Sequence, residues 1–136
     1  MKYPQTIAQS LAKNMQSIAD NACCAFTFMW CLGLDLSDSE AIQTVSDAMT
    51  TGALESDCTV KWAEFGKFLT GKIIDVDFKK CTDISRIKER TPVRFDWNGL
   101  SHWVGVENGR VAFNSLLNSN CVTKGKPAQM RVIKVR

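Results

Sequence analysis

Residues 22–32 of this 136-residue chain read ACCAFTFMWCL. A helix made of these residues would be apolar on every side, which a helix tolerates only when protein surrounds it. Asp20 or Asn21 can cap its first turn by accepting a backbone N–H, and Gly33 can supply the left-handed residue that ends it. We therefore expect a buried central helix over this stretch.

Helical patterns also lie on both sides of the central segment. Ser37 and Glu40 form a capping box, S-x-x-E, which opens a helix that stops near Gly52. Apolar residues at helical spacing indicate an earlier helix over residues 5–19 and a later one closed by Gly71. Their apolar positions are Ile7, Leu11, Met15 and Ile18 in the earlier helix and Trp62, Phe65, Phe68 and Leu69 in the later one.

The second half of the chain changes to the alternating pattern of strands. Five strands are expected, over residues 72–78, 92–97, 100–107, 110–116 and 130–135, and a short helix is compatible with residues 83–89. Asn98-Gly99 and Asn108-Gly109 favour hairpin turns, so three consecutive strands should form an antiparallel meander. Helices followed by strands indicate an α+β fold, in one domain spanning residues 1–136.

The composition is ordinary for a soluble globular protein, with 45% apolar and 23% charged residues. No apolar run approaches the ~20 residues that a membrane helix needs, and residues 1–14 lack the apolar region of a secretory signal. We therefore expect a cytoplasmic protein with no membrane partner. The net charge of +3 comes from scattered basic residues, so we expect no nucleic-acid partner.

Six cysteines lie at positions 23, 24, 31, 58, 81 and 121. Without a secretory signal, reduced thiols are expected rather than a disulfide framework. A zinc site built from Cys58, Cys81, Cys121 and His102 is the metal alternative, but no C-x-x-C pair marks it. Since no glycine-rich phosphate loop or carboxylate-rich motif is present either, we expect neither a cofactor nor a metal.

Two residues suggest chemistry: Cys23 and His102, which is the only histidine. Cys23 would lie in the first turn of the central helix, where backbone N–H groups and a nearby imidazolium both favour a thiolate. The same N–H groups can stabilise an oxyanion. Cys24 is the alternative nucleophile, because a one-residue shift of the helix start would exchange the two thiols. The competing interpretation makes both cysteines small residues of an apolar core.

The hairpin at residues 107–109 decides which residue could orient the imidazole. A three-residue loop with Gly109 in a bulge places His102 opposite Asn114. A two-residue Asn-Gly turn instead places His102 opposite Ser115 and puts Asn114 on the other face of the sheet. Asn114 is the orienting residue under the first loop type, and Ser115 replaces it under the second. An amide in this role fixes the ring tautomer without titrating.

Two segments carry a family resemblance. Residues 23–27, CCAFT, resemble the Cys-Trp-Ala-Phe-Ser that begins the central helix of papain-family peptidases. Residues 101–116, SHWVGVENGRVAFNSL, are similar to the histidine strand, hairpin and Asn/Asp strand of papain-like and bacteriocin-processing (C39-like) peptidases. Most of the chain also resembles an uncharacterised family of phage and prophage proteins assigned to this fold. The resemblance implies a papain-like fold and a triad of Cys23, His102 and Asn114.

The function implied by this resemblance is that of a thiol hydrolase, a cysteine peptidase that cleaves an amide or isopeptide bond in a peptide or protein substrate. Papain-type enzymes place an oxyanion-hole glutamine six residues before the nucleophile, and here that position is Ser17. Gln16 and Asn21 are the candidate substitutes. The missing glutamine supports an alternative, in which the chain is a catalytically silent papain-like module that binds or inhibits a target.

Overall fold

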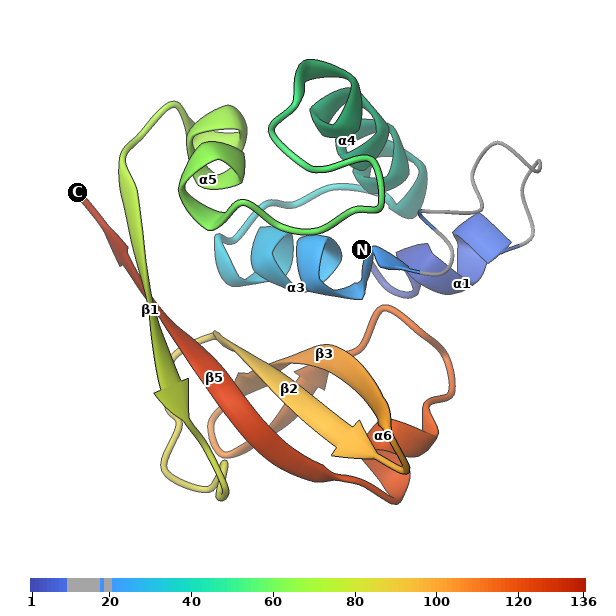
Figure 1. The fold of residues 1–136 in the computed structure, drawn as a ribbon, viewed down its shortest axis with the longest axis vertical. Coiled ribbons are helices and arrows are strands. Elements are labelled where there is room, and N and C mark those ends of the chain that lie inside the picture. Colours follow the sequence, from blue (N-terminus) through green and yellow to red (C-terminus); the bar gives the residue numbers. More distant parts are fainter. Residues whose placement is uncertain (10–17, 19–20) are drawn as a thin grey trace.

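The computed structural model describes residues 1–9, 18 and 21–136 of the chain (Figure 1). Helices come first along the chain and strands follow, with one short helix between the last two strands. The elements are α1 Pro4–Gln9, α3 Cys23–Cys31, α4 Asp38–Thr51, α5 Trp62–Thr70, β1 Ile74–Lys80, β2 Thr91–Trp97, β3 Leu100–Glu107, β4 Arg110–Phe113, α6 Asn120–Thr123 and β5 Lys126–Val135. The predicted α+β class is confirmed.

The five strands form one antiparallel sheet in the order β1-β5-β2-β3-β4. The predicted meander is confirmed as β2, β3 and β4, which are neighbours in the sheet. Its two turns have positive φ at both residues, 50° and 77° at Asn98-Gly99 and 53° and 76° at Asn108-Gly109. This is the backbone that a two-residue type I′ hairpin requires.

Several strand boundaries differ from those expected. β1 begins at Ile74 rather than at 72, β4 ends at Phe113 rather than at 116, and β5 begins at Lys126 rather than at 130. The C-terminal strand β5 also lies between β1 and β2, so it pairs with strands far away in the sequence on both sides. Long-range pairing of this kind extends a strand beyond its local alternating pattern.

The short helix that the sequence allows over residues 83–89 does not form. The Asp83 carboxylate accepts hydrogen bonds from the backbone N–H and the hydroxyl of Ser85, both at 3.0 Å. The Ile87 N–H donates to the Ile84 carbonyl oxygen at 3.0 Å, which closes a turn. A side chain that satisfies the backbone locally competes with helix formation, and here it prevails.

The central helix α3 lies between the sheet and the helices α4 and α5 (Figure 1). Its helical residues begin at Cys23, and its N-cap Ala22 makes no side-chain hydrogen bond. The predicted cap by Asn21 is therefore wrong, and Asp20 lies outside the described residues. The predicted end is confirmed, because Gly33 follows the C-cap with a φ of 76°. The N–H groups of Gly33 and of the next residue donate to carbonyl oxygens in the last turn of the helix.

The other predicted helices agree with the structure where it describes them. Ser37 caps α4 in a capping box, since its hydroxyl accepts from the Glu40 N–H at 3.1 Å and the Glu40 carboxylate accepts from the Ser37 N–H at 3.0 Å. Gly52 and Gly71 adopt the left-handed conformation after α4 and α5. The helix expected over residues 5–19 is represented by α1, and residues 10–17 and 19–20 lie outside the described part.

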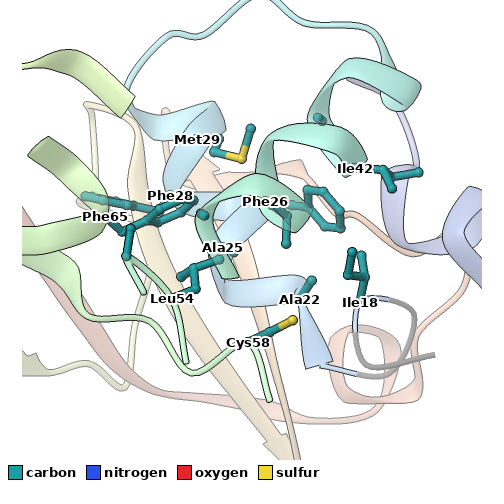
Figure 2. Packing of buried hydrophobic residues seen from close by; sticks show 14 of the residues in the cluster. Ile18, Ala22, Ala25, Phe26, Phe28, Met29, Ile42, Leu54, Cys58 and Phe65 are labelled. Atoms are coloured by element: carbon teal, nitrogen blue, oxygen red, sulfur yellow. The ribbon is translucent and has the colours of Figure 1, made fainter. Parts of the chain in front are cut away.

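Two apolar clusters hold the layers together. Phe26, Phe28 and Met29 of α3 are fully buried against Ile42 of α4 and Phe65 of α5 (Figure 2). Burial of each large apolar side chain stabilises the fold by roughly 1.5–3 kcal/mol. The second cluster lies on the other face of the sheet and contains Val93, Phe95, Val104, Val106, Cys81 and Cys121. The all-round apolar pattern of residues 22–32 thus correctly predicts a helix enclosed by protein.

Alternation along β3 separates the two faces of the sheet. A Cβ added at Gly105 would collide with the ring of Trp30, so this position faces α3. Val104 and Val106 point to the second cluster on the opposite face.

None of the helices in the described part of the chain is long and apolar enough to cross a membrane.

Candidate active site

A cleft of about 460 Å³ opens at the start of α3. Cys23 and Cys24 both line it, and both residues are partly exposed. The other lining residues are Asn21, Asp57, Cys58, Thr59, Val60, Trp62, Trp103 and Arg131. The cleft therefore combines three cysteines with two tryptophans and one charge of each sign.

The edge of β3 at Trp103 brings the strand and the helix together. β4 ends opposite Gly105, so none of the described strands pairs with β3 on that side at Trp103. The Thr27 hydroxyl donates to the Trp103 carbonyl oxygen at 3.2 Å, and the Trp103 backbone lies near enough to the Cys23 sulfur to oppose the rise in its pKa. Cys23 and Thr27 are four residues apart and share one helix face. This strand edge positions the sulfur.

His102, the residue before Trp103, is 4% exposed and makes a short hydrogen bond. Its Nε2 lies 2.7 Å from Oδ1 of Asn114. The Leu116 N–H donates to the same Oδ1 at 3.1 Å, so the amide presents its oxygen to the ring. In the neutral imidazole, Nε2 must then carry the proton and Nδ1 must be the basic nitrogen.

A β-bulge explains why Asn114 reaches His102 although the hairpin has a two-residue turn. Glu107 pairs with Arg110 around that turn, and this register alone would put Asn114 on the wrong face. The register shifts between Gly105 and Val106, so that Gly105 lies opposite Phe113. The one extra residue restores Asn114 to the face of His102. The loop type that favoured Asn114 in the sequence is not the one observed, but the bulge has the same effect.

Ser115, the alternative orienting residue, serves another purpose. It is fully buried, and its hydroxyl donates to Oε1 of Gln5 at 2.8 Å. Its carbonyl oxygen accepts from the N–H groups of Gln5 and Thr6 at the start of α1. Ser115 thus fixes the segment after β4 to the N-terminal helix.

The two adjacent thiols differ in their electrostatic surroundings. Burial raises the pKa of Cys23, but hydrogen bonds from the backbone of Trp103, Cys24 and Cys23 itself oppose that effect. Burial and the neighbouring Cys23 raise the pKa of Cys24 much further, and only the charge of Arg131 opposes them. Of the two, Cys23 has the better stabilised thiolate.

The histidine is neutral in this state. Burial lowers the pKa of His102, and the hydrogen bond with Asn114 partly opposes that effect. Among the residues that the structure describes, no hydrogen bond joins the ring to Cys23 or Cys24. The site therefore contains a neutral Cys23 thiol and a neutral His102 imidazole, which lie on opposite sides of the β3 backbone.

The candidate oxyanion residues have different outcomes. Asn21 is exposed and lines the cleft with the two thiols. Gln16 lies outside the described residues. The opposite wall of the cleft is a tight turn in which Cys58 has a φ of 68°, an uncommon backbone for a residue with a side chain. The Cys58 N–H donates to the Glu55 carbonyl oxygen at 2.9 Å, which holds this turn in place.

Two features of the cleft could not be identified from the sequence as part of the site. The Trp103 backbone carries no sequence signal, and Arg131 lies almost thirty residues from His102. Thr27 was detectable, because it lies four residues after Cys23 on a helix. In the metal alternative, Cys58, Cys81, Cys121 and His102 are not brought together, and no group of three or more His, Cys, Asp or Glu side chains in the described part could hold a metal ion.

All six cysteines lie in the described part of the chain, and none of them forms a disulfide. The cysteines that line the cleft are therefore free thiols.

Comparison with known proteins adds no family to this geometry: no protein-family model matches the chain, and neither a curated protein nor a solved structure is significantly similar to it.

Proposed function

We propose that this chain is a papain-like cysteine peptidase or amidase in which Cys23 is the nucleophile, His102 the general base and Asn114 the orienting residue. The hydrogen bond of 2.7 Å between His102 and Asn114 carries the proposal. A buried imidazole with a fixed tautomer has a defined basic nitrogen, and the next residue along the strand contacts the Cys23 sulfur. Such an arrangement supports acyl transfer to sulfur.

In the proposed reaction, Nδ1 of His102 takes the proton from the Cys23 thiol as the sulfur attacks a substrate carbonyl carbon. The carbonyl oxygen becomes an oxyanion, which backbone N–H groups at the start of α3 can stabilise, with Asn21 beside them. The C–N bond then breaks, and the leaving amine takes the proton from His102. Water attacks the resulting thioester as His102 accepts its proton. The C–S bond then breaks and His102 returns the proton to the sulfur, which releases the carboxylic acid and the free thiol.

The reaction requires the imidazole and the Cys23 sulfur to approach hydrogen-bonding distance. Alternation along β3 puts the His102 ring on the face of Val104 and Val106, away from α3, so this end of the strand must also rearrange to turn the ring toward the sulfur. Because the pKa of Cys23 is raised and that of His102 is lowered, the base acts on a thiol rather than in a preformed ion pair. Activity should therefore rise with pH as His102 loses its proton, and the midpoint of this rise should lie below the ordinary imidazole pKa of about 6.5.

One observation favours the second candidate, a silent binding module of the same fold. The raised pKa of both cleft thiols leaves neither sulfur as a ready nucleophile at neutral pH. A module of this kind would use the cleft to bind a peptide without cleaving it. The two candidates differ in whether an acyl group is transferred to Cys23.

Acetyl transfer from p-nitrophenyl acetate tests the proposal. The thiol attacks the ester, nitrophenolate leaves, and peptide mapping by mass spectrometry locates the acetyl group. We expect rapid acetylation of Cys23, lost in Cys23→Ala, slowed at least tenfold in His102→Gln, and unchanged in Cys31→Ser at the far end of α3. Acetylation of Cys24 instead would reassign the nucleophile, and equally slow acetylation of all six thiols would support the silent module.

A further inference from the structure

Among the residues that the structure describes, Arg131 is the one cation that lines the cleft beside Cys23 and Cys24. It lies on β5, opposite Phe78 of β1, and its guanidinium is 5.4 Å from the ring centre of Trp62 and 5.8 Å from that of Trp103. The Phe78 ring is 5.2 Å away. Three aromatic rings therefore hold the guanidinium in one place, as cation–π contacts do.

The protein provides this guanidinium with few polar partners. Its Nη2 donates to Oε1 of Gln129 at 3.1 Å, while its Nε is buried without a hydrogen-bond partner. In the described part of the chain, no carboxylate forms an ion pair with Arg131. The cleft does contain Asp57, but that carboxylate is exposed and accepts the Thr59 N–H of its own turn at 3.0 Å.

A half-buried, unpaired guanidinium costs stability, because it loses water without gaining a counter-charge. An apolar side chain such as methionine would fill the same space between the rings without that cost. The cost is recovered if a ligand supplies the negative charge. A guanidinium binds a planar carboxylate through parallel N–H donors, which makes it suited to this role.

We propose that Arg131 binds a carboxylate of the molecule that occupies the cleft and thereby selects acidic substrates. This inference rests on the proposed function, since it names the substrate class of the same cleft. The guanidinium also acts on the thiols, because its charge lowers the pKa of Cys24. Because Arg131 and Cys23 line the same cleft, the carboxylate would be bound in the cleft that contains the candidate nucleophile. It comes either from an acidic side chain or from the C-terminus of a peptide.

Two alkylating reagents of the same shape test this proposal without requiring peptide cleavage. Iodoacetate carries a carboxylate, and iodoacetamide is its neutral counterpart; both form an S–C bond and release iodide. The ratio of their rates at Cys23, and at Cys24, measures how well the cleft attracts a carboxylate. A charged hydrogen bond contributes enough free energy to change a rate about tenfold or more.

We expect the iodoacetate to iodoacetamide ratio to fall about tenfold in Arg131→Met and to be partly retained in Arg131→Lys. Arg110→Met, on the exposed part of β4, is the matched control and should leave the ratio unchanged. We also expect Arg131→Met to leave the thermal midpoint unchanged or to raise it. An unchanged ratio in Arg131→Met, or an equal fall in Arg110→Met, would overturn the proposal.

The source of the carboxylate is distinguished by protecting Cys23 from iodoacetamide. Protection by the α-amide of acetylglutamate indicates an acidic side chain, and protection by acetylglutamine with a free carboxylate indicates a C-terminus. Equal effects of both acids and of the neutral acetylglutamine amide contradict carboxylate selection. If the cysteine peptidase proposal fails, acetyl transfer to Cys23 is absent while the alkylation ratio still depends on Arg131, so the two failures are distinguishable.

Discussion

Replacing Asn114 by alanine tests the hydrogen bond on which the candidate site depends. Its Oδ1 accepts from Nε2 of His102 at 2.7 Å and from the Leu116 N–H at 3.1 Å. Without the amide, the buried ring N–H loses its acceptor, which costs about 1–3 kcal/mol. The Leu116 N–H loses the same acceptor, but it belongs to a half-buried residue and can bond water instead. This second loss adds about 0.5–1 kcal/mol to the cost.

We therefore expect Asn114→Ala to lower the free energy of unfolding by about 1.5–4 kcal/mol, measured by urea denaturation. The corresponding fall in the thermal midpoint is roughly 5–16 °C for a domain of this length. Asn118→Ala, in the exposed part of the same loop, is the control and should change the free energy by less than about 0.5 kcal/mol.

The same substitution has a second readout in the titration of the imidazole. Because the bond to Asn114 raises the pKa of His102, its removal should lower that pKa further, while Asn114→Asp should raise it by adding a negative charge. The chain has a single histidine, so NMR titration of the ring gives one unambiguous curve. A pKa that is unchanged or higher in Asn114→Ala, with stability equal to that of Asn118→Ala, would refute the reasoning.

Three further outcomes follow from the structure. The pKa of His102 is lower in the folded protein, so the unfolded chain binds a proton more readily. The free energy of unfolding should therefore decrease as the pH falls below about 6.5 and level off below the pKa of the folded state. Urea denaturation at several pH values checks this, and His102→Gln should remove this dependence on pH. Gly105→Ala should lower stability by about 1–3 kcal/mol, seen in the thermal midpoint, because its methyl group would collide with the Trp30 ring. Ser37→Ala should cost about 1 kcal/mol in urea denaturation through loss of the helix cap, whereas the exposed neighbour Ser39→Ala should cost little; equal losses in both would contradict the capping box.

Local sequence signals correctly predicted most helix ends and both hairpins. The capping box at Ser37, the left-handed residue Gly33 and the Asn-Gly turns all depend on the backbone of a few adjacent residues. Such interactions involve only residues close together in the sequence, so the motif itself indicates them. The start of α3 was less certain, because Ala22 there caps the helix without a side-chain hydrogen bond.

The candidate site was partly predictable for the same reason. The sequence alone indicates that a cysteine lies at the start of an enclosed helix and that the lone histidine lies on a strand. Their relation was not visible, since the partner of His102 depends on a bulge between Gly105 and Val106. One additional residue in a strand reverses which side chains share a face, and no local pattern marks where the bulge forms.

The sequence by itself determined the α+β class, the enclosed position of α3 and the turns of the meander, because periodicity and capping act over a few residues. Only the tertiary structure decided that β5 lies between β1 and β2, that α3 covers the strand edge at Trp103, and that Arg131 faces the two thiols. These are contacts between segments distant along the chain, and their energies depend on how whole surfaces pack together.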